Sequence, residues 1–365
     1  MLLVIGTRPE AIKLAPIAHA LAARGWPPAL IFTGQHPLDD LQSFDLEGFA
    51  SVRLGCAGED DPHEHVRRVK RAMAPLLEDP PRMLVVQGDT SSALGGALAG
   101  FAADVLVAHV EAGLRTHDAT LPWPEEEYRT AIDARAELLF APTELAAKNL
   151  RAENVPGAIH VTGNSGIDAL LTVEAQLPTP TPRHGELRRI LVTCHRRESW
   201  GDGMTSVAEA LLELARDAGT QIDFVLHPNP SIATAMRGLV GGRPNIALLE
   251  PCSHRELVRR MRDSTLILSD SGGMQEEAPA LGVPLLVLRA KTERPEGIAT
   301  GNMLLVGTDR DRIVGETRRL LSDPFAYAAM SRRALPYGDG RASERIAEIM
   351  VQRLGEGRDR ERRSA

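Results

Sequence analysis

The sequence predicts an α/β protein with two doubly wound domains, each a sheet of parallel strands between two layers of helices. The first observation is that short apolar runs alternate with longer stretches of helical periodicity along the chain. The second is that the three prolines of the polar segment 177–184 interrupt this alternation, after which it begins again. The length of 365 residues also suits two domains of ordinary size. We therefore expect domains at residues 1–170 and 185–342.

The expected strands are continuous apolar runs, which are typical of strands buried on both faces of a parallel sheet. In the first domain they cover residues 2–5, 29–33, 83–87, 105–110, 138–142 and 159–162. In the second domain they cover residues 190–193, 222–227, 246–249, 266–269 and 284–288. Helices are expected at residues 11–23, 91–102, 203–217, 255–262, 272–281 and 312–321.

Composition and charge argue against several classes of protein. The formal net charge is −7, whereas general nucleic-acid binders are more often basic, and we interpret the basic clusters at 67–71 and 259–262 as solvated helix faces. The sequence has no run of about 20 apolar residues, so no membrane span is expected. Three cysteines without a Cys-x-x-Cys pair make no disulfide framework, and the first residues do not read as a signal peptide. We expect a cytoplasmic protein without nucleic-acid or membrane partners.

Glycines and polar residues follow the expected strands, on the side where open α/β sheets bind ligands. In the first domain these residues are 6–10, with Lys13 one turn later, 88–90 and 111–115, and in the second they are 195–198, His227 and 269–273. Four titratable residues are interpreted as acid–base groups that line a cleft between the domains, namely Asp89, Glu111, Glu125 and His195.

The clearest local signal is a turn from a strand into a helix at Ser271, Gly272 and Gly273. Two glycines allow a close approach to the backbone, and the free N–H groups of a helix N-terminus favour a phosphate. Glu277, about one turn into the helix, is placed to accept hydrogen bonds from ribose hydroxyls. The alternative is a plain N-cap by Ser271. The pattern is neither G-x-G-x-x-G nor a Walker motif, so NAD and ATP lose support.

Two further acids and a histidine have simpler interpretations. Glu126 and Glu127 follow a helix-starting proline, where acidic side chains complement the helix dipole. His109 and Glu111 alternate in a strand and do not match a zinc motif, so no metal site is predicted.

Ten stretches of the chain match a known family. They are GTRPEAIKLAPI (6–17), TGQH (33–36), GDT (88–90), HVEAGLRT (109–116), PWPEE (122–126), TGNSGIDAL (162–170), HRRES (195–199), SDSGGMQEEAPALG (269–282), TERPE (292–296) and LVGTD (305–309). With these residues the chain resembles the bacterial non-hydrolysing UDP-N-acetylglucosamine 2-epimerases, over nearly its whole length.

The resemblance implies a GT-B-like fold, with two Rossmann-like domains around a cleft and a C-terminal helix, at about 343–357, that returns to the first domain. It implies reversible conversion of UDP-N-acetylglucosamine (UDP-GlcNAc) to UDP-N-acetylmannosamine (UDP-ManNAc) without a cofactor or metal. The implied chemistry is elimination of UDP to give 2-acetamidoglucal, followed by re-addition of UDP. A homodimer is also implied.

The resemblance also implies roles for single residues. The diphosphate would be held by Arg8, Lys13, His195, Ser271, Gly272, Gly273 and Arg294. Protons would be transferred by Asp89, Glu111 and Glu125, with the identity of the base left open, and Glu277 matches the ribose-binding acid. An activating second UDP-GlcNAc would meet Gln35, Arg67, Arg196 and His227.

Departures from the family pattern keep other activities open. They are His117, Tyr128, Cys194, Cys252, Leu257 and Leu38, the last of which replaces a polar residue of the activating site. The alternatives are a hydrolysing 2-epimerase, a 2-epimerase of a modified UDP-HexNAc, a GT-B glycosyltransferase and a non-catalytic nucleotide-sugar sensor. The presence of all four acid–base residues favours the epimerase.

Overall fold

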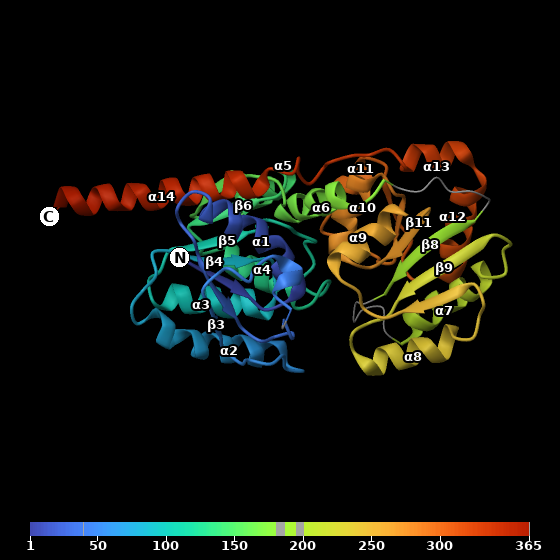
Figure 1. Ribbon diagram of the computed structural model, residues 1–365, viewed down its shortest axis with the longest axis horizontal. Coiled ribbons are helices and arrows are strands. Elements are labelled where there is room, and N and C mark those ends of the chain that lie inside the picture. Colours follow the sequence, from blue (N-terminus) through green and yellow to red (C-terminus); the bar gives the residue numbers. More distant parts are fainter. Residues whose placement is uncertain (39, 180–186, 195–200, 365) are drawn as a thin grey trace. The chain divides into compact units, whose positions relative to one another are not determined.

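The computed structural model describes residues 1–38, 40–179, 187–194 and 201–364. The chain divides into two compact units, Met1–Ala169 with Tyr337–Ala365 (unit 1) and Leu170–Pro336 (unit 2), each with its own sheet (Figure 1). Both sheets are parallel throughout the described strands, which confirms the predicted α/β class. Residues 180–184 of the predicted linker lie outside the described residues.

The sheet of unit 1 has seven strands in the order β3-β2-β1-β4-β5-β6-β7. They are β1 (Leu2–Ile5), β2 (Ala29–Phe32), β3 (Ser51–Arg53), β4 (Leu84–Gln87), β5 (Val107–Val110), β6 (Leu138–Ala141) and β7 (Ala158–Val161). The strand order reverses between β1 and β4, and the carboxyl ends of strands at such a switch point are where ligands bind. The sequence did not predict β3, because its three residues are exposed and form no apolar run.

Helices cover both faces of this sheet. They are α1 (Arg8–Ala22), α2 (Pro62–Met73), α3 (Ser91–Ala102), α4 (Glu125–Asp133), α5 (Glu144–Ala152) and α14 (Ala342–Ser364). Helix α6 (Ser165–Gln176) begins in unit 1 and passes into unit 2 at Leu170. Val4 and Val86 face a core shared with α2 and α3, whereas their neighbours Leu3 and Val85 face a core shared with α1 and α14. Successive strand residues therefore enter opposite cores, which is why the strands are continuous apolar runs.

The C-terminal helix α14 belongs to unit 1 and packs against α1. Its residues Ile346, Ala347 and Met350 are buried in the same core as Leu14 of α1. The helix spans Ala342–Ser364, so it is longer than the segment 343–357 expected from the sequence.

The sheet of unit 2 has six strands in the order β10-β9-β8-β11-β12-β13. They are β8 (Arg188–Thr193), β9 (Thr220–Val225), β10 (Ile246–Leu249), β11 (Leu266–Ser269), β12 (Leu285–Val287) and β13 (Met303–Leu305). The helices are α7 (Asp202–Leu214), α8 (Pro230–Val240), α9 (His254–Arg262), α10 (Gly272–Leu281), α11 (Glu296–Ala299), α12 (Arg310–Ser322) and α13 (Pro324–Met330). The order reverses between β8 and β11, and α10 begins just after β11.

Helix α1 begins at Arg8 rather than at the predicted residue 11. Thr7 and Glu10 form a capping box, in which the Thr7 backbone N–H donates to Glu10 Oε2 at 2.6 Å, and Pro9 lies in the first turn. The turn after β1 is therefore the N-terminus of a helix, and it lies at the carboxyl end of a central strand.

Candidate active site

Lys13 and Glu111 form a buried ion pair at the carboxyl edge of the unit 1 sheet. Lys13 lies in the second turn of α1, Glu111 follows β5, and Lys13 Nζ is 2.5 Å from Glu111 Oε2. The side chains are 11% and 5% exposed, so water screens the pair little. Gln87, the last residue of β4, donates to the same carboxylate oxygen. Three strand ends thus contribute to the placement of one carboxylate.

The backbone at Glu111 is left-handed, with φ of 69°, which costs on the order of 1 kcal/mol for a residue with a side chain. Two hydrogen bonds hold it there, since the backbone N–H groups of Glu111 and Ala112 donate to the Phe140 carbonyl at 3.0 and 3.1 Å. The strained turn aims the Glu111 side chain at Lys13.

Asp89 follows β4 and therefore lies at the same sheet edge as Glu111, because Gln87 and Val110 are partners in the β4–β5 ladder. Its Oδ2 accepts a hydrogen bond from Nη2 of Arg129, a side chain of α4 that is 2% exposed. Each of the two carboxylates is thus placed by a buried cation.

Glu126 connects the same arginine to the loop before α4. Its Oε2 lies 3.1 Å from Arg129 Nη1, and its Oε1 accepts hydrogen bonds from the backbone N–H groups of Thr116 and His117, each at 3.0 Å. The interpretation of Glu126 as a plain helix-start charge is therefore wrong, because the side chain is buried and paired. Glu127, by contrast, is 53% exposed.

Glu10 is a buried carboxyl that links the turns after β1 and β4. Its Oε2 accepts from the Gly6 backbone N–H at 2.9 Å and from the Thr7 hydroxyl at 2.8 Å, and its Oε1 accepts from the Thr90 hydroxyl at 2.7 Å. Burial raises the pKa of Glu10 to about 7, although its hydrogen bonds act in the opposite direction. Glu10 thereby ties the turn before Arg8 to the turn that carries Asp89.

Arg8 and Glu125 are the first residues of α1 and α4, and both are half-buried. A guanidinium at a helix N-terminus adds to the positive end of the helix dipole, so Arg8 and the first turn of α1 together favour an anion. Glu125 lies on the same helix as Arg129, the partner of Asp89.

In unit 2 the structure brings Ser271, Gly272 and Arg294 together at the start of α10. Ser271 is the N-cap residue, as the plain N-cap alternative predicts, but its side chain makes no capping hydrogen bond with any described residue. A Cβ added at Gly272 would lie 2.9 Å from Arg294 Nη1, so this glycine makes room for the guanidinium. Glu276 holds Arg294 Nε at 2.6 Å, and Glu293 pairs with Nη1. A buried cation therefore lies against a helix N-terminus, which is a suitable place for a phosphate.

Gly273 and Glu277 extend this region along α10. A Cβ at Gly273 would meet no described atom closer than Ser271 Oγ at 3.9 Å, so its surroundings are open. Glu277 Oε1 lies 3.1 Å from Nε2 of His254, the first residue of α9. The histidine orients a carboxylate one turn beyond the glycines.

Of the residues expected at a second nucleotide-sugar site, Gln35 and Arg67 lie in unit 1 and His227 in unit 2. Gln35 Oε1 accepts from the Ser92 hydroxyl at 2.7 Å, and the exposed Arg67 pairs with Glu64 at 2.7 Å. His227 is half-buried after β9. Arg196 and His195 lie outside the described residues.

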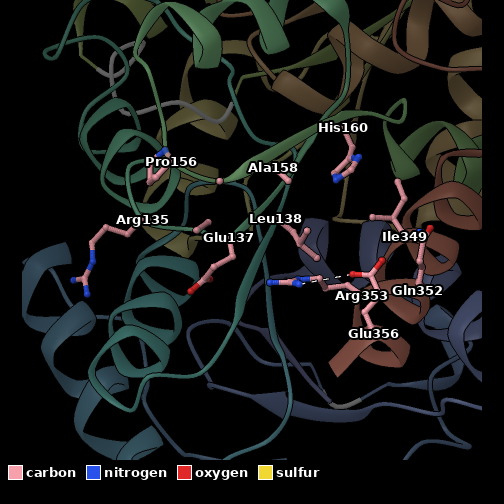
Figure 2. Close-up of a pocket in the computed structure, with 12 residues that line it drawn as sticks. Arg135, Glu137, Leu138, Pro156, Ala158, His160, Ile349, Gln352, Arg353 and Glu356 are labelled. Atoms are coloured by element: carbon pink, nitrogen blue, oxygen red, sulfur yellow. Dashed lines mark ion pairs between the residues drawn. The ribbon is translucent and has the colours of Figure 1, made fainter. Parts of the chain in front are cut away.

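A pocket of about 470 Å³ opens at the opposite edge of the unit 1 sheet (Figure 2). It is lined by Leu138 and Ala158, the first residues of β6 and β7, and by His160, Ile349 and Arg353. The pocket lies at the amino ends of these strands, whereas Asp89 and Glu111 follow carboxyl ends. Its lining includes none of the described site residues.

Sequence reasoning missed Gln87 and Arg129 as parts of this site, and it included Glu10 among the polar strand-end residues without giving it a role. Each signal was present, since Gln87 is a polar residue that ends an apolar run, and Arg129 is a cation one turn after Glu125. Their partners come from other elements, however, and only the fold shows these pairings. Within the described ranges there is no group of three or more His, Cys, Asp or Glu side chains that could hold a metal ion. Nor is any helix in the described part of the chain long and apolar enough to cross a bilayer.

Two parallel-sheet units with polar site residues at strand ends and a helix N-terminus define a GT-B-like α/β enzyme. A family model described as "UDP-N-acetylglucosamine 2-epimerase" matches residues 19–351. The UDP-N-acetylglucosamine 2-epimerase of Escherichia coli (strain K12) is 42% identical over 368 residues, which cover 96% of this chain and 98% of that protein. The chain belongs to the UDP-N-acetylglucosamine 2-epimerase family.

Two solved structures share the fold over the same extent. The UDP-GlcNAc 2-epimerase of Neisseria meningitidis bound to UDP-GlcNAc is 36% identical with a TM-score of 0.89, covering 96% of this chain and 99% of that chain. The UDP-GlcNAc 2-epimerase of Methanocaldococcus jannaschii in complex with UDP-GlcNAc and UDP is 31% identical with a TM-score of 0.84, covering 96% and 99%.

Proposed function

We propose that this chain catalyses the reversible epimerisation of UDP-GlcNAc at C2, which gives UDP-ManNAc. The observation that carries the proposal is the placement of Asp89 and Glu111 after neighbouring strands, each beside a buried cation. Epimerisation requires one group to remove a proton and another to return one on the opposite face. Two separately held carboxylates at one sheet edge suit that requirement.

In the proposed reaction a carboxylate takes the proton from C2 while the C1–O bond to UDP breaks. The electron pair of the C2–H bond becomes the second bond between C1 and C2 of 2-acetamidoglucal, and UDP leaves with the electron pair of the C1–O bond. A proton is then added to the opposite face of C2, and a UDP oxygen returns to C1. Asp89, Glu111 and Glu125 are the candidates for these transfers, and the base among them is left open.

The C2 proton is weakly acidic, so stabilisation of the leaving diphosphate has to lower much of the barrier. We assign this task in unit 2 to Ser271, Gly272, Gly273 and Arg294, with Glu277 on the ribose. In unit 1 the first turn of α1 adds Arg8, and Lys13 adds an ammonium, which has three donors in all. His195 completes the proposed set.

The proposal is tested by incubating the purified protein with UDP-GlcNAc and, separately, with UDP-ManNAc, and following both by NMR. We expect the same mixture of the two nucleotide sugars from either direction. Free N-acetylmannosamine with UDP would identify a hydrolysing epimerase instead. If neither sugar is converted, this substrate is excluded, and the next trial is a modified UDP-HexNAc, which the departure at Tyr128 keeps open. Asp89→Asn is the matched inactive control.

Three properties remain predictions, and the family resemblance implies two of them, the homodimer and the activation. They are a homodimer, a cytoplasmic location, and activation by a second UDP-GlcNAc at Gln35, Arg67, Arg196 and His227. Sedimentation measures the first. A sigmoidal dependence of rate on UDP-GlcNAc, made hyperbolic by Arg67→Ala, tests the third.

A further inference from the structure

A buried pair outside the predicted site contacts both turns of unit 1 that carry a carboxylate. These are the turn after β4, with Asp89, and the turn after β5, with Glu111; we call them the carboxylate turns. His109 is in β5 and Asp133 is the last residue of α4, and both side chains are 0% exposed. His109 Nδ1 lies 2.6 Å from Asp133 Oδ1, and His109 Nε2 lies 2.8 Å from the Gly88 carbonyl oxygen. Gly88 directly precedes Asp89, so the histidine holds the backbone next to a predicted acid–base group.

The other oxygen of Asp133 holds the turn after β5. Asp133 Oδ2 accepts from the Gly113 backbone N–H at 3.1 Å and lies 2.8 Å from Arg115 Nη2. Gly113 is two residues after Glu111, whose left-handed backbone needs support from its surroundings. One carboxylate therefore contacts the Glu111 turn directly and the Asp89 turn through His109.

The contacts also define the charge state of the pair. Burial by itself raises the pKa of Asp133, but the charges and hydrogen bonds of His109 and Arg115 outweigh burial, and the net pKa is below the usual value. An ionised carboxylate and a backbone carbonyl can only accept hydrogen bonds. Both ring nitrogens of His109 face such acceptors, so both must carry a proton.

The charges of this network compensate one another, with Glu153 at its exposed end. Arg115 donates to both oxygens of Glu153, at 2.8 and 2.7 Å, as well as meeting Asp133. Two cations, His109 and Arg115, thus face two anions, Asp133 and Glu153. A paired, hydrogen-bonded set of this kind is rigid, and removing one member leaves a buried charge without its partner.

We propose that His109 and Asp133 are positioning residues that hold Asp89 and Glu111 in a fixed mutual geometry, with His109 present as a doubly protonated imidazolium. Neither side chain is accessible, so neither meets substrate. The inference rests on the proposed function only in giving Asp89 and Glu111 acid–base roles. Displacement of reacting groups by about 1 Å can slow a reaction about 100-fold, so loss of the pair is expected to lower kcat by that factor.

The first test compares Asp133→Asn with Asp168→Asn in the full-length protein. Asp168 is a matched control, because it is a buried carboxylate of unit 1 that accepts from the backbone of two α14 residues, Ala342 at 3.2 Å and Ser343 at 2.7 Å. We expect Asp133→Asn to lower kcat about 100-fold while the KM for UDP-GlcNAc and the Kd for UDP change less than about threefold. We expect Asp168→Asn to keep the wild-type kcat. An unchanged kcat in Asp133→Asn, or an equal loss in both variants, overturns the proposal.

A double variant tests whether His109 and Asp133 act on kcat as one unit. His109→Gln combined with Asp133→Asn replaces both charged partners by amides, so the double variant is expected to lose no more kcat than either single variant. If the fold-losses in kcat of the single variants multiply in the double variant, the two residues act independently, which would contradict the proposal.

NMR of the His109 ring tests the proposal even if the variants fail to fold or the wild type proves inactive. In ¹⁵N-labelled wild-type protein at neutral pH, the His109 ring is expected to show a proton on each nitrogen. A ring with one proton overturns the proposal. An inactive wild type with a doubly protonated ring contradicts the proposed function while leaving the positioning pair intact.

Discussion

The ammonium of Lys13 lies 2.5 Å from the carboxylate of Glu111, and both groups are buried in unit 1. This contact joins the helix after β1 to the turn after β5, which are far apart in sequence. An ammonium and a carboxylate in such surroundings stabilise each other, because burial disfavours an unpaired charge. The loss of either partner is therefore expected to be costly.

We expect Glu111→Gln to lower the free energy of unfolding by about 3 kcal/mol, because it leaves the Lys13 charge buried without its partner. Lys13→Met should have a similar effect for the reciprocal reason. The double variant should lose less than the sum of the two, since both charges are then absent. Urea unfolding measures all three, with the exposed Glu127→Gln as a control that changes stability by less than about 0.5 kcal/mol. Additive losses would argue against the ion pair.

Glu10 predicts a pH dependence of stability. Its pKa is raised from 4.5 to about 7 in the folded protein, so the folded state binds the proton more tightly than the unfolded state does. Its contribution to stability is therefore present below about pH 4.5 and is lost as the pH rises to about 7. We expect Glu10→Gln, which cannot ionise, to gain stability relative to the wild type over this interval. Urea unfolding of both proteins across this pH interval measures the difference in their free energies of unfolding. If the advantage of Glu10→Gln stays constant or falls as the pH rises, the raised pKa of Glu10 is contradicted.

Gly272 and Gly273 differ in what a side chain would meet. An added Cβ at Gly272 would be 2.9 Å from the Arg294 guanidinium, whereas at Gly273 it would come no closer than 3.9 Å to Ser271 Oγ. We expect Gly272→Ala to displace Arg294 and weaken UDP binding about tenfold, which corresponds to about 1.4 kcal/mol. Gly273→Ala should not destabilise the free protein, because alanine favours a helix more than glycine does.

Calorimetric titration with UDP and thermal unfolding of both glycine variants test this prediction. If the two variants lose UDP affinity equally, the displacement of Arg294 is not the cause, and that account of the anchor fails.

Asp89→Asn should lower kcat by about 1,000-fold and leave the Kd for UDP within about twofold of the wild type. The physical reason is that Asp89 is placed by Arg129 of unit 1, whereas the part of the proposed nucleotide anchor formed by residues 271–273 and Arg294 belongs to unit 2. Stopped assays with UDP-GlcNAc and UDP titrations give the two values. Loss of UDP affinity in this variant would assign Asp89 to nucleotide binding instead.

Much of the fold was predictable because it depends on patterns local in sequence. The strand at Leu2–Ile5 and the helix at Ser91–Ala102 have the predicted bounds, because a short apolar run and a stretch of small residues are visible directly in the sequence. β3 escaped prediction because an exposed edge strand of three residues carries no such pattern. Helix α1 begins at Arg8, before the predicted residue 11, because its capping box of Thr7 and Glu10 precedes the apolar periodicity.

The candidate site was predictable in its polar strand ends but not in its pairings. Glu126 has the sequence context of a helix-start charge, and only the fold shows that it holds the backbone of Thr116 and His117. The contacts of Asp133 with His109 and Gly113 span 24 and 20 positions, so local spacing does not indicate them.

The most direct test of the account is incubation of the purified protein with UDP-GlcNAc in deuterated water, followed by NMR of the C2 position. If the proton removed from C2 exchanges with solvent before a proton is returned, the product carries deuterium. We therefore expect deuterium at C2 of UDP-ManNAc and, as the reaction reverses, at C2 of the remaining UDP-GlcNAc. Conversion with the original hydrogen retained at C2, or folded protein that produces neither conversion nor exchange, would contradict the proposed chemistry.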